Sequence, residues 1–191
     1  MKEVLISINP KWCELIASGK KTVEVRKTKP KLETPFKVYI YCTKQFYRKG
    51  NGYFQGKYCG KVIGEFICDK IENIEIRHFT VFGHENRYTA VGENPDYQWL
   101  KKSCLSYNEV VKYGKLAPLY GWHITDLVIY DKPRELYDFV NYDKHEGCLK
   151  KNCFSGDCWG CPNNAIVVRP PQSWCYVKQF EREAEYERDF I

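Results

Sequence analysis

The sequence predicts an α+β fold, a mixed β-barrel of several short strands with short flanking helices. Three observations lead to this prediction. Apolar runs of strand length recur along the chain, and two segments have the spacing and end signals of short helices. Hydrophobic residues make up 43% of the chain and aromatic residues 16%, which is enough for a real core. The 191 residues fit one domain with an insertion or two very small domains, and we expect a single domain over 1–191 that contains one insertion.

The first predicted elements are a strand and a helix. Val4–Ile8 is a short apolar run of strand type. Asn9 can cap a helix, Pro10 fits its first position, and the helix is predicted over Lys11–Ser18, with Gly19 as the stop. Three residues spaced three and four apart give this helix an apolar face: Trp12, Leu15 and Ile16.

The next predicted strand has a polar side. Thr22–Arg26 alternates with a period of two, so Val23 and Val25 point one way while Glu24 and Arg26 point the other. A row of polar side chains therefore faces away from the core.

Later elements follow from apolar, β-branched and aromatic runs. Further strands are predicted at Lys37–Cys42, Gly60–Cys68, Tyr120–Tyr130, Ala165–Arg169 and Trp174–Val177. The glycine-rich stretch 49–60 is predicted to be a long loop or a hairpin. Ser106 and Glu109 have capping-box spacing and open a short helix that Gly114 ends.

A cluster of four cysteines predicts a structural zinc (Zn²⁺) site in a small insertion over 143–164. The cysteines are Cys148, Cys153, Cys158 and Cys161. The gap of two residues in the last pair lets both sulfurs face one tetrahedral ion, and a closed set of four thiolates leaves no open position for catalysis. An iron–sulfur cluster, metal-free thiols and disulfides are the alternatives, and His145 could replace one cysteine.

The remaining cysteines are interpreted as small apolar core residues. They are Cys13, Cys42, Cys59, Cys68, Cys104 and Cys175. No apolar run has the length of a membrane helix, and the first residues lack a secretory signal, so we expect no membrane association and a cytoplasmic location.

Positive charge is concentrated near the N-terminus. Between Lys20 and Lys61 the chain has twelve lysines and arginines against two glutamates. Such a segment suits a phosphate-bearing partner, and the aromatic residues interleaved with it could stack on bases. The alternative is a solvated surface loop with ordinary strand aromatics.

One motif resembles a known family. Gly19, Lys21, Glu24 and Arg26, after the predicted strand and helix, form the pattern Gly-x-Lys-x-x-Glu-x-Arg, which resembles the ASCH family of the PUA-like superfamily. The resemblance covers most of residues 4–130 and resumes at 169–177. It implies a PUA-like barrel with a cleft beside the first helix, and binding of RNA or of a modified nucleoside.

The predicted ligand-binding residues combine this resemblance with the polar row. Residues i and i+2 of a strand lie about 7 Å apart, close enough to share a ligand or an ion pair. The predicted set is Lys21, Glu24, Arg26, Trp122, Arg169 and Trp174. Two alternatives stay open: a surface salt-bridge row on an edge strand, and core positions for the two tryptophans.

The resemblance also implies an enzymatic alternative. Some ASCH relatives are amidohydrolases that remove the acyl group from N4-acylated cytidine such as N4-acetylcytidine. Lys21 would carry over as the catalytic lysine with Glu24 as the nearby acid, although Glu24 stands where the hydrolase pattern has a threonine, and Glu109 is a further candidate acid. A third alternative is a protein partner that docks on the cysteine-rich insertion.

Overall fold

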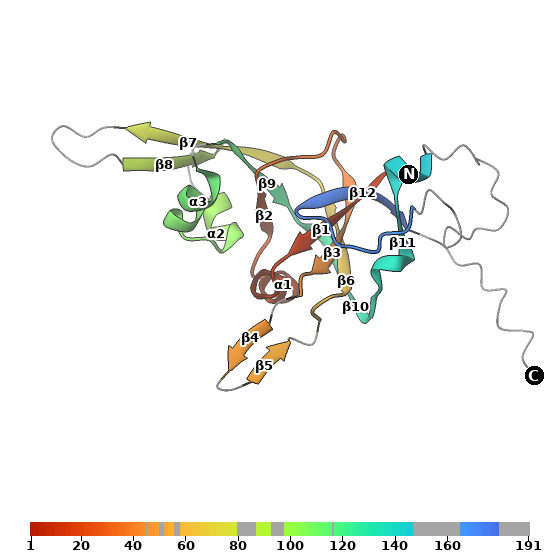
Figure 1. The fold of residues 1–191 in the computed structure, drawn as a ribbon. Coiled ribbons are helices and arrows are strands. Elements are labelled where there is room, and N and C mark those ends of the chain that lie inside the picture. Colours follow the sequence, from red (N-terminus) through yellow and green to blue (C-terminus); the bar gives the residue numbers. More distant parts are fainter. Residues whose placement is uncertain are drawn as a thin grey trace, which may run out of the picture.

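The computed structural model describes residues 1–44, 46–49, 52–55, 58–79, 87–92, 98–115, 117–146 and 165–179. Most of the strands form two sheets (Figure 1). The larger sheet has six strands in the order β10-β6-β3-β1-β12-β11. Their bounds are β1 (Glu3–Ile8), β3 (Phe36–Cys42), β6 (Val62–Cys68), β10 (Thr125–Arg134), β11 (Phe139–Asn141) and β12 (Trp174–Gln179). The pair β1 and β3 is parallel, and the other neighbouring pairs are antiparallel.

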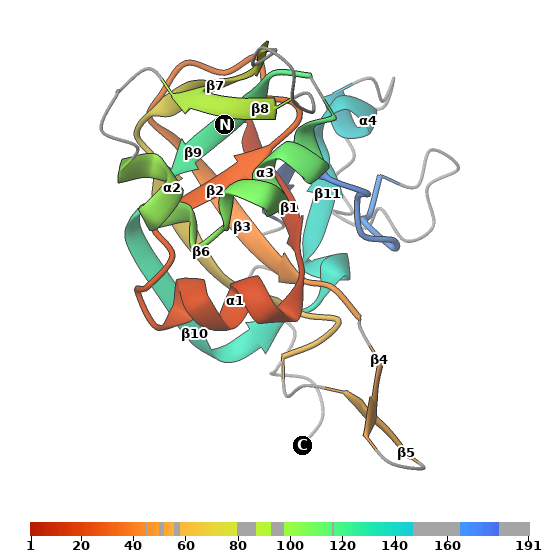
Figure 2. The same cartoon turned by 90° about the vertical axis from the view of Figure 1, so that its left-hand side faces the viewer.

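The smaller sheet has four strands in the order β2-β9-β7-β8, and all of its pairs are antiparallel. Their bounds are β2 (Val23–Arg26), β7 (Ile71–Phe79), β8 (Arg87–Gly92) and β9 (Leu119–His123). A hairpin of β4 (Phe46–Lys49) and β5 (Gly52–Gln55) projects away from both sheets (Figures 1 and 2).

The helices are short. They are α1 (Pro10–Ala17), α2 (Gln98–Ser103), α3 (Tyr107–Gly114) and α4 (Tyr142–Glu146), with a 3₁₀ turn at Leu136–Asp138. As predicted, the Asn9 side chain accepts a hydrogen bond from the Lys11 amide, and Ser106 and Glu109 form a capping box. Figure 2 shows α2 and α3 in front of β2 and β9. Trp99 of α2 and Val110 of α3 belong to the same buried cluster as Val23 and Val25, so these helices cover the apolar side of β2.

The α+β class is confirmed, but the prediction of a β-barrel is wrong. Closure would require the two edge strands of a sheet to pair, and in the described part of the chain β10 and β11 lie at opposite edges of the six-stranded sheet without pairing. The two sheets pack instead through a shared core that includes Ile6, Ile40 and Trp122. The prediction failed because edge pairing is a long-range property that strand patterns do not encode.

Two predicted strands also differ from the structure. The run predicted as one strand over 120–130 is divided into β9 and β10 by Ile124. Asp126, the second residue of β10, has a left-handed φ of 47°. The predicted strand at 165–169 makes only an isolated bridge between Val140 and Ile166. No helix in the described ranges is long and apolar enough to cross a membrane.

Candidate functional site

Lys21, Glu24 and Arg26 meet in a buried ion network, which we call the buried triad. The Oε2 atom of Glu24 lies 3.2 Å from Lys21 Nζ, and its Oε1 atom lies 3.1 Å from Arg26 Nη2. The three residues are only 2%, 6% and 8% exposed. The prediction that they come together is therefore confirmed, and the alternative of a surface salt-bridge row is wrong because all three side chains are buried.

The turn after α1 sets the position of Lys21. Gly19 has a φ of 71°, a left-handed conformation that glycine adopts at no steric cost. The amides of Lys20 and Lys21 both donate to the Leu15 carbonyl oxygen, at 2.9 and 3.0 Å. The chain thus turns back at the end of α1 and directs Lys21 toward β2.

The Lys21 ammonium group has three oxygen acceptors. Besides Glu24, it donates to the Val23 carbonyl oxygen at 2.8 Å and to the Ser103 carbonyl oxygen at 2.7 Å. A protonated lysine has three N–H donors, so these three contacts fit the charged form.

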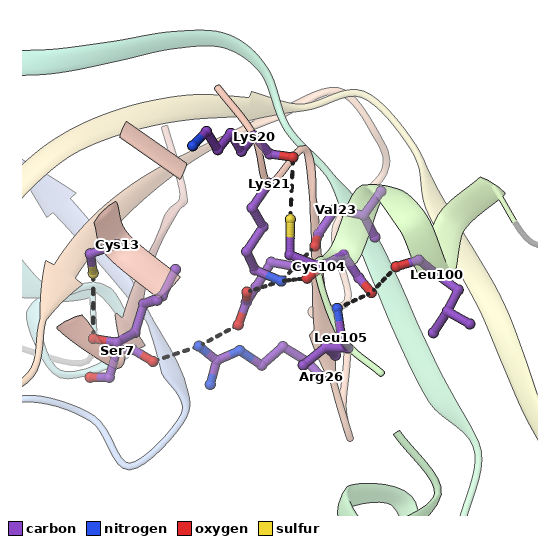
Figure 3. A network of polar contacts seen from close by, with 12 residues as sticks. Ser7, Cys13, Lys20, Lys21, Val23, Arg26, Leu100, Cys104 and Leu105 are labelled. Atoms are coloured by element: carbon purple, nitrogen blue, oxygen red, sulfur yellow. Dashed lines mark hydrogen bonds and ion pairs between the residues drawn. The ribbon is translucent and has the colours of Figure 1, made fainter. Parts of the chain in front are cut away.

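Arg26 joins β2 to β1 and to the segment that precedes β12. Its Nη2 atom donates to the Ser7 carbonyl oxygen at 2.5 Å. Figure 3 shows the Arg26 side chain extending toward Ser7. Ser7 in turn donates from its hydroxyl to the Pro171 carbonyl oxygen at 2.7 Å and from its amide to the Ser173 carbonyl oxygen at 2.9 Å.

The triad carries an excess of positive charge, since two cations share one carboxylate. In addition, the buried Nε atom of Arg26 has no hydrogen-bond partner within the described residues. Burial of an unbalanced charge and of an unpaired donor costs free energy. An anionic or hydrogen-bond-accepting ligand near Arg26 would offset both costs.

Trp12 lies against the triad on the side of α1. Its half-buried ring has the Lys21 Nζ atom 5.2 Å from its centroid and the Nζ atom of exposed Lys11 at 4.3 Å. Both distances suit cation–π contacts.

Two tyrosines border the triad on its other sides, and each has a lysine over its ring. Tyr113 of α3 is 38% exposed, with Lys27 Nζ at 4.9 Å. Burial raises the pKa of the Tyr113 hydroxyl, the charge of Arg26 lowers it, and the charge of Glu24 raises it. Tyr120 pairs with Arg26 across β9 and β2, and Lys29 Nζ lies 5.3 Å from its ring. We call these residues the aromatic rim: Lys11, Trp12, Lys27, Lys29, Tyr113 and Tyr120.

The family model of the ASCH domain matches residues 6–113, which is more than half of the chain. The chain belongs to the ASCH domain family. The match includes the whole triad and five of the six residues of the aromatic rim, all except Tyr120. No curated protein sequence matches the chain.

Solved structures of ASCH proteins have a similar fold. The crystal structure of ASCH from Zymomonas mobilis aligns with a TM-score of 0.54 at 18% identity, over 92% of this chain and 87% of that chain. Two variants of that protein, with a serine-to-alanine and a tyrosine-to-phenylalanine substitution, align with the same score and identity, covering 92–93% of this chain and 88–91% of theirs. At this identity the likeness establishes the fold alone.

The other predicted ligand residues lie outside the triad and after the residues that the family model matches. Trp122 is fully buried, with Phe36 at 5.9 Å and Trp174 at 6.1 Å between ring centroids. Trp174 is half-buried, and its indole donates to the Thr28 hydroxyl at 2.9 Å. Arg169 is exposed, and within the described ranges no hydrogen bond or ion pair joins it to the triad. Trp122 is therefore a core residue, which was the alternative to a ligand-binding role for this tryptophan.

Cavities are present elsewhere in the structure. One of about 470 Å³ lies between β3 and the residues around Glu135, and another of about 330 Å³ lies beneath α1. The triad lines neither of them. The family resemblance implied a cleft beside the first helix that contains these side chains; the second cavity lies beside α1, but the triad is not part of its wall.

The basic segment does not form one continuous surface. At least four of its cations are held in intramolecular ion pairs: Lys21, Arg26, Lys37 and Lys61. Several of its aromatic residues are core residues of β3: Phe36, Tyr39 and Tyr41. Two exposed lysines of the aromatic rim belong to this segment, Lys27 and Lys29; Lys11 lies outside it, with its Nζ atom 3.9 Å from Glu109 Oε1.

The four cysteines of the predicted zinc site lie outside the described residues. Among the described residues, no group of three or more His, Cys, Asp or Glu side chains is arranged to hold a metal ion. The two ends of the insertion are held together, because the Asn141 amide donates to the Ala165 carbonyl oxygen at 2.7 Å. The zinc site stays a prediction.

Sequence reasoning missed the partners of the triad. Ser7, Ser103 and Tyr113 come from β1, α2 and α3. The first two act through backbone carbonyl groups, which leave no signal in side-chain identity. Tyr113 had a signal, since it is an aromatic residue on a short helix that a capping box defines.

Proposed function

We propose that this ASCH domain binds RNA or a modified nucleoside at the aromatic rim, over the positively charged floor that the buried triad supplies. The observation that carries the proposal is the set of lysine–aromatic pairs around one buried, positively charged network. The family points the same way, since ASCH domains resemble RNA-binding proteins.

Exposed lysines supply the expected contacts to phosphate. Lys11, Lys27 and Lys29 are exposed and extend from α1 and from the loop after β2. Each would gain binding free energy by releasing counterions from the nucleic acid.

Partly exposed aromatic rings supply the expected contacts to bases. Tyr113 presents a ring that is 38% exposed, and the rings of Trp12 and Tyr120 are half-buried. Stacking of a base on such a ring contributes about 1–3 kcal/mol and accepts any base. Single-stranded RNA or a free nucleoside has the exposed base faces that this mode requires.

The contacts of Lys21 favour binding over hydrolysis. A catalytic lysine acts as base or nucleophile in its neutral form, which has one N–H fewer than the three acceptors around Lys21 require. We therefore place the amidohydrolase alternative second, and expect no conversion of N4-acetylcytidine to cytidine by the folded protein.

Titration of labelled single-stranded RNA at several salt concentrations tests the proposal. We expect affinity to fall steeply with salt, and Lys27→Ala and Lys29→Ala each to lower the slope of log affinity against log salt by about 0.7. Lys144→Ala is the matched control, because Lys144 is an exposed lysine on α4, which packs on β11 and β12. Equal effects of all three substitutions would contradict the proposed site.

A further inference from the structure

Three cysteines from three different elements line one cavity beneath α1. Cys13 lies on α1, Cys42 ends β3, and Cys59 lies in the turn before β6. All three are buried free thiols, and the cavity has a volume of about 330 Å³. The ligand site proposed above uses none of them.

The sulfur of Cys42 is the middle member of this group. Its side chain neighbours those of Cys13 and of Cys59 in the cavity wall, and the Cys13 thiol donates to the Ile8 carbonyl oxygen at 3.5 Å. Main-chain hydrogen bonds fix the arrangement, since the Gly60 amide donates to the Cys42 carbonyl oxygen at 2.8 Å and the Cys42 amide donates to the Lys61 carbonyl oxygen at 2.9 Å. The turn that carries Cys59 is thus held against the end of β3.

The environment divides the roles among these thiols. The neighbouring Cys13 side chain lowers the pKa of Cys42, burial opposes this effect, and the neighbouring Cys59 side chain adds to the lowering. The neighbouring Cys42 side chain and burial raise the pKa of Cys13. The directions of the two pKa shifts favour ionisation of Cys42 over ionisation of Cys13.

Small molecules can reach the group from solvent. The cavity wall includes Glu14, Ala17 and Ser18 on the exposed side of α1, and Tyr58, which is 37% exposed. Ile63 and Ile129 make the inner wall apolar. The volume far exceeds that of a small peroxide.

We propose that these thiols form a peroxide-sensitive centre in which Cys42 is oxidised first and then joins Cys13 or Cys59 in a disulfide bond. The Cys42 thiolate attacks one oxygen of a hydroperoxide, the O–O bond breaks, and the departing oxygen leaves as water or an alcohol, so that Cys42 becomes a sulfenic acid. The neighbouring sulfur then attacks the Cys42 sulfur, the S–O bond breaks, and the thiol proton leaves with that oxygen as water. In total, two thiols lose two electrons, and the peroxide gains them.

A bond to Cys13 would tether α1 to β3. The same helix carries Trp12, whose ring contacts Lys21 of the triad. Oxidation would therefore act on the helix that borders the aromatic rim.

Peptide mapping of the full-length protein tests this centre. Cleavage after lysine places the three cysteines in separate peptides, over residues 12–20, 38–44 and 58–61. After exposure to hydrogen peroxide and alkylation of the remaining thiols, we expect the 38–44 peptide to be linked to one of the other two. We also expect Cys42 to lose its free thiol several-fold faster than Cys104, a half-buried cysteine in the peptide over 103–112.

The rates at which Cys42 and Cys104 are oxidised are compared within the wild-type protein, so the test does not depend on a variant that folds. A Cys42 thiol that stays free while Cys104 is oxidised overturns the proposal, as does a disulfide that links Cys42 to any cysteine other than Cys13 or Cys59. Among variants, Cys42→Ser should abolish the cross-linked peptide, and Cys104→Ser should leave it unchanged.

Discussion

The ammonium group of Lys21 donates a hydrogen bond of 2.7 Å to the carbonyl oxygen of Ser103, which lies 82 residues further along the chain and ends α2. This contact connects the charged motif after α1 to the helix that covers the apolar side of β2. A cation at the end of a helix also interacts favourably with the carbonyl groups exposed there. The triad is therefore part of the packing of the fold as well as the floor of the proposed site.

Removal of the shared carboxylate should destabilise the protein more than removal of the lysine. Glu24→Gln leaves Lys21 and Arg26 buried without a counter-charge, and we expect it to lower the free energy of unfolding by about 3–5 kcal/mol. Lys21→Met leaves the Glu24–Arg26 pair intact, with an expected loss of about 1–3 kcal/mol. Urea unfolding measures the free energy of unfolding of both variants. A larger loss for Lys21→Met than for Glu24→Gln would show that the carboxylate of Glu24 does not stabilise the triad.

The capping box of α3 predicts a pH-dependent contribution to stability. Hydrogen bonds from the Ser106 amide and hydroxyl hold the pKa of Glu109 below its usual range. Because the folded-state pKa is lowered, the stabilisation is present above the unfolded-state pKa of about 4.3 and is lost as the pH falls through the folded-state pKa.

We therefore expect Glu109→Gln to lower stability by about 0.5–1 kcal/mol near neutral pH, with a difference from wild type that shrinks in acid. Thermal unfolding at several pH values measures this difference. Glu33→Gln is the control, since Glu33 is an exposed acid outside any helix or strand. If the stability difference between Glu109→Gln and wild type stays constant with pH, the capping interaction is excluded as the cause of that difference.

A glycine in β6 marks a close approach of two strands. A Cβ atom at Gly64 would lie 2.3 Å from the backbone oxygen of Val128 in β10, which cannot move without disturbing the strand pair. At Gly121 of β9 the nearest atom would be a methyl carbon of Val23 at 3.1 Å. We expect Gly64→Ala to cost about 1–3 kcal/mol by chemical unfolding and Gly121→Ala to cost less. Equal losses of unfolding free energy for the two variants would show that β10 moves to accommodate the added methyl group.

The cysteine-rich insertion is proposed to hold one structural zinc ion. The purified protein should then contain about one zinc per chain under reducing conditions, and Cys158→Ser should lower both the zinc content and the stability. Cys104→Ser, outside the insertion, should keep its zinc. Metal analysis that finds iron, or no metal, would contradict the zinc assignment.

Local patterns predicted the local part of this fold. Asn9, Pro10 and Gly19 mark the ends of α1 correctly, and the alternation in 22–26 predicted both β2 and the proximity of Glu24 and Arg26. These features depend on residues within a few positions of one another, where helix caps and strand periodicity apply.

Long-range features escaped prediction for a physical reason. The hydrogen bond between Ser7 and Pro171 joins residues 164 positions apart, and no local pattern encodes it. Burial of the triad depends on α2, a helix of six residues that is too short to show a clear helical period. Strand β7 was missed because its charged residues mask the period-two spacing of Ile74 and Ile76.

Chemical-shift mapping tests the proposed binding surface most directly. Addition of single-stranded RNA to the isotope-labelled protein should shift the backbone amides of Lys27, Lys29 and Tyr113 and the indole N–H of Trp12, and leave the amides of α4 unchanged. The account predicts that the largest shifts lie on the aromatic rim. Shifts confined to α4, β11 and β12, with the rim unchanged by bound RNA, would contradict it.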